Sequence, residues 1–172
     1  VDSLLEHPLV RARWRRGEPL GSGEETRPPP AFPSPGVIAV ISYAQSLAPF
    51  LSGSDYEKLK NAAAANDYEV ALQKNFKKWL LSRVFDSGDV RLMGHSIGFI
   101  NLNDAHTLID EVLVNDVYGY EALAPKPHIL DVGASNGLFC FSVLKRFPGA
   151  RVTAVEPLPE NISLLRRNLS AF

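Results

Sequence analysis

The strongest constraint on the fold is a pair of short apolar segments near the C-terminus, the first followed by a glycine-flanked turn. Residues 128–132 read His-Ile-Leu-Asp-Val, and residues 152–157 read Val-Thr-Ala-Val-Glu-Pro. Short runs rich in branched apolar residues are typical of parallel strands covered on both faces. Gly133 and Gly137 flank the turn, where the backbone must adopt positive φ or approach a ligand closely. We therefore expect two buried parallel strands joined by a helix, with a ligand at the carboxyl edge of the sheet.

Length, composition and charge exclude several classes of partner. The chain has 172 residues, 45% of them hydrophobic and 22% charged, which are ordinary values for one globular domain. A net charge of -1 predicts no general attraction to nucleic acid or to anionic membranes. The longest other apolar stretch, residues 37–51, is too short to span a bilayer, and the first residues lack the order of a secretory signal. We expect a cytoplasmic protein without a nucleic-acid or membrane partner.

Disulfide and metal chemistry are not expected. Cys140 is the single cysteine, which excludes an intrachain disulfide and a multi-cysteine zinc site. Its position within Leu-Phe-Cys-Phe predicts a small buried side chain. The four histidines show no spacing that would place two metal ligands on one helix face.

The chain divides into three predicted regions. Residues 1–36 combine clustered arginines with repeated prolines and lack apolar periodicity, which predicts a disordered, solvated tail or linker. Residues 37–115 are expected to form a mainly helical cap with a short β-hairpin. Residues 116–172 contain the two strands and begin the cofactor-binding domain.

Two helices are expected at the start of the cap. Residues 37–51 form the first, and the pattern Ser54-Asp55-Tyr56-Glu57 predicts a capping box at the start of the second. The second helix should run to about Val84 and break near residues 66–67. Six of its positions follow helical spacing and form one predicted, mainly apolar core face: Leu72, Phe76, Trp79, Leu80, Arg83 and Val84.

A β-hairpin and a further helix are expected next. Residues 90–93 and 96–100 read as short strands around Gly94-His95, a Gly-X pair that suits a type II′ turn. The Asn or Asp at 103–104 would then cap a helix, although the alternation in residues 111–114 also fits a strand. Both interpretations of that segment stay open.

Two cofactor classes compete for the strand, turn, helix and strand arrangement. The dinucleotide fingerprint needs a middle glycine that lets the backbone reach a pyrophosphate, but Ser135 occupies that position. Asp131 at the strand end would repel a pyrophosphate and attract a cation, which favours S-adenosyl-L-methionine, a phosphate-free sulfonium. Glu156, about 20 residues beyond the glycines, can accept hydrogen bonds from the ribose of either cofactor. An NAD(P)-binding dehydrogenase half-domain is the alternative.

The segment from about 111 to 168 resembles the FkbM-type class I S-adenosylmethionine-dependent methyltransferases. That family shows an acidic-apolar pair, a tyrosine, D-x-G-A-N-x-G, E-P-x-P and L-x-x-N. Ser135 stands where the family usually has Asn. The matching residues here are Glu111-Val112, Tyr118, Asp131 to Gly137, Glu156-Pro157-Leu158-Pro159 and Leu165-Arg166-Arg167-Asn168.

The resemblance implies a Rossmann-like α/β fold and methyl transfer from S-adenosylmethionine to a small-molecule acceptor, a sugar or natural-product hydroxyl. It implies no catalytic base, and Tyr118 is equally well explained as a cofactor contact or a core aromatic. Both acidic residues also have purely structural interpretations: Asp131 as a carboxylate that binds the turn amides, and Glu156 as a surface carboxylate at a strand end. The cofactor-binding residues that it implies are Tyr118, Asp131, Gly133, Ala134, Ser135, Asn136, Gly137, Glu156 and Pro157.

Only the first part of such a domain is expected in this sequence. A class I core resembles a seven-stranded sheet, whereas residues 116–172 supply two strands. Two parallel strands leave unpaired edges and uncovered apolar faces. We therefore expect an incomplete domain that folds poorly unless the N-terminal helices cover it or a partner completes the sheet. The isolated chain is expected to be inactive and to self-associate through its unpaired sheet edges. The non-enzymatic alternative is an interaction module at 37–115 attached to a degenerate Rossmann-like remnant.

Overall fold

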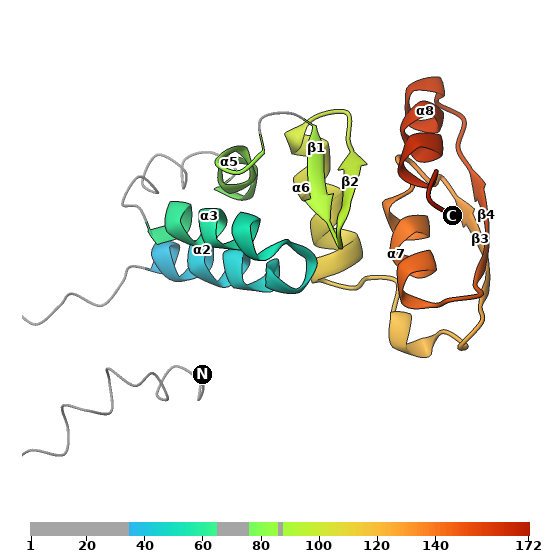
Figure 1. Ribbon diagram of the computed structural model, residues 1–172, viewed down its shortest axis with the longest axis horizontal. Helices are drawn as coiled ribbons and strands as arrows, with labels where there is room; N and C mark the ends of the chain where they lie inside the picture. The colour runs from blue at the N-terminus through green and yellow to red at the C-terminus, as the bar shows by residue number, and fades with distance from the viewer. Residues whose placement is uncertain (1–34, 65–75, 86–87) are drawn as a thin grey trace, which may run out of the picture. The chain divides into compact units, whose positions relative to one another are not determined.

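Two small β-sheets and the helices packed on them make up the part of the chain that the computed structural model describes, which is residues 35–64, 76–85 and 88–172 (Figure 1). This is the mixed α/β arrangement that the sequence predicts. The predicted tail lies outside the described residues except for Pro35 and Gly36, which begin the first helix instead of ending a linker. The predicted break near residue 66 and the core position Leu72 also lie outside them.

The first described elements are helical, as predicted. Leu59, Leu80 and Leu81 have no exposed surface and join one hydrophobic core. Leu81 is a core residue that the predicted apolar stripe omitted. The elements are α2 (Pro35–Ser46), the short 3-10 helix η2 (Ala48–Phe50), α3 (Gly53–Ala64) and α5 (Phe76–Ser82).

The cap of α3 lies two residues before the predicted one. The Ser52 hydroxyl accepts a hydrogen bond from the Asp55 backbone N–H at 3.2 Å and donates one to the Asp55 carboxylate at 2.8 Å. Ser52 is therefore the residue that caps the helix, and the prediction of a capping box that begins at Ser54 is wrong. Asp55 occupies the third helical position because its carboxylate also binds the Arg91 guanidinium, at 2.6 and 2.9 Å, which fixes the register of the helix start.

Strands β1 (Asp89–Leu92) and β2 (His95–Gly98) form the predicted antiparallel hairpin. Its two-residue turn is Met93-Gly94, and both residues have positive φ, 48° and 80°. Positive φ at both central positions defines a type I′ turn, whose twist matches that of the flanking strands. The predicted type II′ turn at Gly94-His95 is therefore wrong by one residue.

Helix α6 (Leu102–Ile109) is capped by Asn101 and not by the predicted residues 103–104. The Asn101 side-chain oxygen accepts hydrogen bonds from the two backbone N–H groups at those positions, at 2.8 and 3.0 Å. A π-helical segment, η3 (Asp110–Val114), follows directly. The strand interpretation of residues 111–114 is therefore wrong. A 3-10 turn, η4 (Tyr120–Ala122), leads towards the second sheet.

The C-terminal elements follow the predicted order of strand, helix, strand and helix. The strands pair in parallel, with His128 opposite Arg151 and Val132 opposite Val155. Both helices lie on the same face of this sheet (Figure 1). The elements are β3 (His128–Val132), α7 (Leu138–Arg146), β4 (Arg151–Val155) and α8 (Pro159–Asn168).

The other face of the β3–β4 sheet is exposed, which corrects the prediction of strands buried on both sides. Leu130 and Val132 retain 67% and 73% of their accessible surface, whereas their strand neighbour Ile129 packs against the core. The reason is that the rest of the chain packs on the helices and not on the bare face of the sheet. Hairpin β1–β2 packs on α8 and segment η3 packs on α7, and both helices lie on the face of the sheet that they already cover. The predicted uncovered apolar face is therefore present in the described structure.

One hydrophobic core joins the helical part, the hairpin and the second sheet. Phe141 and Val143 of α7 belong to the same buried cluster as Val90 and Ile97 of the hairpin. Residues 33–172 accordingly form one compact unit. Within the described ranges, no helix is both long and apolar enough to cross a membrane.

Candidate functional site

The turn between β3 and α7 has an uncommon backbone conformation. Gly133, Ser135 and Gly137 have φ values of 84°, 49° and 82°. A positive φ at a non-glycine residue is uncommon and is enriched at ligand-binding sites. Gly137 is constrained further because a Cβ atom there would lie 3.2 Å from Cγ of Leu165 in α8, so the glycine permits close helix packing.

The backbone N–H groups of this turn donate hydrogen bonds within the chain. Those of Gly133 and Ala134 both donate to the Val155 carbonyl, at 2.8 and 3.0 Å, and that of Gly137 donates to the Ala134 carbonyl at 2.8 Å. The Ser135 N–H donates to the Glu156 carboxylate at 2.8 Å. These four donors are therefore directed at β4 and at the turn itself. A pyrophosphate would have to displace these bonds before it could bind the turn.

A small cavity of about 30 Å³ lies against the turn. Six of the nine predicted cofactor residues line it: Tyr118, Asp131, Gly133, Ala134, Ser135 and Asn136. The other lining residues are apolar: Leu108, Val112, Leu138 and Phe139. Ligand pockets usually measure about 300 to 1,000 Å³. The cavity formed by the described residues is therefore much smaller than a usual ligand pocket.

The cavity lining includes one acidic side chain and two aromatic rings. Asp131 lines it, and its carboxylate accepts a hydrogen bond from the Cys140 thiol at 3.0 Å. The Tyr118 and Phe139 rings stack with centroids 4.3 Å apart. Partial burial raises the pKa of Tyr118, and the negative charges of Asp131 and Glu111 raise it further. An acidic field beside two rings favours a cationic ligand.

Tyr118 is half exposed, with 51% of its surface accessible. The core-aromatic interpretation of Tyr118 is therefore excluded, and its ring forms part of the cavity wall. Tyr120 is the buried aromatic of this segment. Burial raises the pKa of Tyr120 to about 12, and its hydroxyl bonds to the Ser142 hydroxyl.

Glu156 joins the turn to the start of α8. Its carboxylate accepts hydrogen bonds from the backbone N–H groups of Ser135 and Leu158, at 2.8 and 2.9 Å, and from the Asn161 amide at 3.4 Å. The Leu158 hydrogen bond is the main cause of a lowered Glu156 pKa, and the Ser135 bond contributes. The carboxylate is therefore ionised at neutral pH and binds the turn amide of Ser135, a structural role that the sequence suggested for Asp131 and not for Glu156. It has room for further donors, since a carboxylate has about four acceptor sites.

The remaining predicted residues lie beside the cavity or take part in packing. Gly137 directly precedes α7, and Pro157 is exposed next to Glu156; neither lines the cavity. Asn136 lines it but is itself almost fully buried. Its side chain donates to the Gly98 carbonyl at 2.8 Å and accepts from the Leu138 backbone N–H at 3.2 Å.

Several residues of the site were not predicted from the sequence. Leu108 and Val112 reach the cavity from α6 and η3, and their spacing of four residues was a usable signal for one helix face. The π-helical turn is a second signal, because such segments are frequent at functional sites. Cys140 was predicted to be buried, which is confirmed, but its bond to Asp131 requires tertiary structure.

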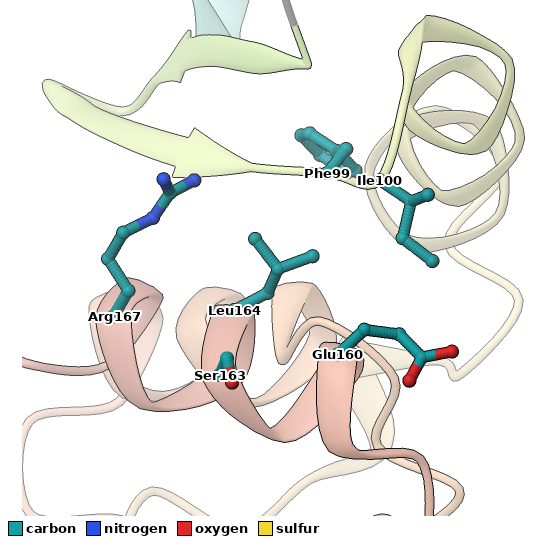
Figure 2. Close-up of a pocket in the computed structure, with 6 residues that line it drawn as sticks. All are labelled: Phe99, Ile100, Glu160, Ser163, Leu164 and Arg167. Carbon is teal, nitrogen blue, oxygen red and sulfur yellow. The ribbon is translucent and has the colours of Figure 1, made fainter.

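A second cavity, of about 470 Å³, lies between the end of β2 and α8 (Figure 2). Its lining residues are Phe99, Ile100, Glu160, Ser163, Leu164 and Arg167. In Figure 2 the Arg167 and Leu164 side chains point from α8 towards the strand above them. The Arg167 guanidinium is paired with Asp89 at 2.5 Å. This open groove contains no predicted cofactor residue, so the smaller cavity at the turn is the candidate site.

A metal centre has no support in the described part of the chain, where no three His, Cys, Asp or Glu side chains come close enough to share an ion.

Three known proteins match parts of this chain. The AMB antimetabolite synthetase AmbE of Pseudomonas aeruginosa is 38% identical over 81 residues, which are 46% of this chain and 4% of that protein. The methyltransferase sdnD of Sordaria araneosa is 33% identical over 67 residues, 39% of this chain and 26% of that enzyme. The release factor glutamine methyltransferase of Chlorobaculum tepidum is 42% identical over 48 residues, 28% of this chain and 16% of that enzyme.

The chain is similar, over part of its length, to methyltransferases. It spans about a quarter or less of each of these three proteins. No known protein family matches the chain, and no solved structure matches it significantly. The FkbM-type assignment therefore stays a prediction.

Proposed function

We propose that this chain supplies the methionine end and the ribose-binding carboxylate of an S-adenosylmethionine site in an FkbM-like methyltransferase. The observation that carries the proposal is the grouping of three predicted cofactor residues at the β3–α7 turn. There Asp131 and Tyr118 line one cavity, and Glu156 is bound to the same turn through Ser135. The partial similarity to two methyltransferases supports it independently.

The hydrogen bonding of the turn favours a sulfonium cofactor over a dinucleotide. A pyrophosphate needs backbone N–H groups directed at it, whereas those of Gly133, Ala134 and Ser135 already donate within the chain. The carboxylates of Asp131 and Glu111 lie close enough to the cavity to raise the pKa of Tyr118. This charge would attract a sulfonium and an ammonium group and would repel phosphates.

The proposed reaction transfers a methyl group to an oxygen of a sugar or natural-product hydroxyl. The cofactor, when bound, supplies the electrophilic methyl carbon. The part played by this chain is to hold the methionine end in the acidic cavity, so that the acceptor oxygen, methyl carbon and sulfur can lie in line. Such positioning supplies much of the rate of a transfer of this kind. We assign neither an acceptor site nor a general base to the described residues.

The proposal is tested by titrating this chain with S-adenosylmethionine while recording backbone amide NMR spectra, which detect weak binding to an incomplete site. We expect shifts at Gly133, Ser135 and Gly137, and weaker or no shifts with NADH. Glu156→Gln should weaken binding by about tenfold or more, because it removes a charged acceptor for the ribose hydroxyls. Circular dichroism would establish that the variant is folded.

Glu160→Gln is the matched control. It makes the same change of charge at an exposed position in the first turn of α8. It should leave the affinity unchanged within a factor of about two. Equal losses in the two variants, or no shift at the turn with millimolar S-adenosylmethionine, would contradict the proposal. Stronger shifts with NADH would instead favour the dehydrogenase half-domain.

A further inference from the structure

The backbone of Gly98, at the end of β2, is bound by two buried asparagine side chains. Its N–H donates to the Asn168 side-chain oxygen at 2.8 Å. Its carbonyl accepts from the Asn136 amide at 2.8 Å and from the Asn168 amide at 2.9 Å. Both asparagines are almost fully buried. We call these three residues the Gly98 clamp.

The clamp reaches the cofactor turn directly. The Asn168 amide also donates to the backbone carbonyl of Asn136 at 2.8 Å. The side-chain oxygen of Asn136 in turn accepts from the backbone N–H of Leu138, the first residue of α7, at 3.2 Å. The hairpin, the turn, α7 and α8 therefore meet in one buried hydrogen-bond network.

Glycine at position 98 lets the side chains of α8 pack close to the end of β2. A Cβ atom there would lie 1.4 Å from Nη2 of Arg167 and 3.0 Å from a methyl group of Leu164. Figure 2 shows these two side chains extending from α8 towards the strand. Asparagine suits position 168 because the site needs one acceptor, for the Gly98 N–H, and two donors, for the carbonyls of Gly98 and Asn136.

We propose that Asn168 is a positioning residue for the cofactor turn. It acts through Gly98 and the Asn136 carbonyl, and holds residues 133–137 in the conformation that lines the acidic cavity. A turn held in advance loses less conformational entropy when a ligand binds. This inference rests on the proposed function, because the ligand whose affinity it affects is S-adenosylmethionine. It makes the β1–β2 hairpin a structural support of the site.

Asn168→Asp is the most specific test of the clamp because it replaces only the side-chain amide nitrogen. The acceptor for the Gly98 N–H remains, but an anionic oxygen replaces the donor and faces the carbonyls of Gly98 and Asn136. We expect amide hydrogen exchange at Gly137 and Leu138 to become about tenfold faster or more, and the dissociation constant for S-adenosylmethionine to rise by a similar factor. Asn168→Ser, with a hydroxyl that donates and accepts, provides a second variant if the aspartate prevents folding.

The pH profile separates positioning from general destabilisation. Protonation of the carboxyl group that Asn168→Asp introduces would restore one donor, and burial beside two carbonyls raises the pKa of such a group. The affinity of Asn168→Asp relative to wild type should therefore recover partly between about pH 8 and pH 6. Leu59→Ala in α3, which makes none of the clamp hydrogen bonds, is the stability control. When Leu59→Ala and Asn168→Asp are compared under conditions that give them the same free energy of unfolding, Leu59→Ala should keep wild-type values. These are the amide hydrogen exchange rates at residues 137 and 138 and the affinity for S-adenosylmethionine.

The outcomes are distinguishable. Two results for Asn168→Asp would overturn the clamp proposal while leaving the proposed function intact. One is amide hydrogen exchange at residues 137 and 138 as slow as in wild type. The other is wild-type affinity for S-adenosylmethionine despite faster exchange. A loss of affinity that Leu59→Ala reproduces at equal stability would also overturn it. Failure of the wild-type chain to bind S-adenosylmethionine would refute the proposed function, and with it the cofactor role of the clamp.

Discussion

The exposed face of the β3–β4 sheet predicts an unequal response to the same substitution at two strand leucines. Leu130 in β3 is 67% exposed, and Leu92 in β1 is fully buried. Changing each to alanine removes the same atoms from a strand, so strand propensity cancels in the comparison. The difference in their effect on the free energy of unfolding therefore reports burial.

The magnitudes follow from the exposed fractions. Full burial of a leucine side chain contributes about 1.5–3 kcal/mol, and Leu130 buries roughly a third of its surface, so Leu130→Ala should cost about 0.5–1 kcal/mol. Leu92→Ala also leaves a cavity and should cost about 2–5 kcal/mol. Equilibrium unfolding in urea, with circular dichroism as the probe, would measure both costs. If Leu92→Ala lacks a folded baseline, an excluded osmolyte such as TMAO would restore one for all variants.

Protein concentration decides how an unexpected result is interpreted. Equal costs that do not depend on concentration would refute the exposure of this face. A large cost of Leu130→Ala that appears only at high concentration would mean that a second copy of the chain covers the face, since association makes apparent stability concentration-dependent. That result would indicate self-association through this face and not through the predicted sheet edges, and sedimentation equilibrium would check it directly.

Two further predictions concern the start of α3. Ser52→Ala should destabilise the protein by about 1 kcal/mol because it removes the helix cap, whereas Ser54→Ala should change stability by less than about 0.5 kcal/mol; thermal unfolding of the two variants distinguishes them, and equal effects would contradict the cap assignment. The Arg91 hydrogen bond holds the pKa of Asp55 below its usual value of 3.8, so the stability that the ionised carboxylate contributes is complete above that pH and is lost as the pH falls through the lower folded-state pKa. The stability difference between wild type and Asp55→Asn should therefore shrink below pH 3.8, and a pH-independent difference in urea unfolding would refute the ion pair.

Local features of the sequence predicted the second sheet well. The branched apolar runs and the glycines at 133 and 137 predicted the order of β3, α7, β4 and α8, and both glycines have the expected positive φ. Such features can be predicted from the sequence because strand periodicity and left-handed backbone positions depend on residues close together in the chain. Turn and cap positions were less accurate, by one or two residues at Gly94 and Ser54, because neighbouring side chains compete for the same backbone groups.

The composition of the candidate site was only partly predictable. The sequence by itself determined the turn, its acidic flank at Asp131 and the spacing to Glu156. Only the tertiary structure decided that Asn168 binds Gly98 across 70 residues of sequence, that Cys140 binds Asp131, and that one face of the sheet is exposed. The physical reason is that hydrogen bonding and burial depend on which distant elements pack together. No local pattern carries that information.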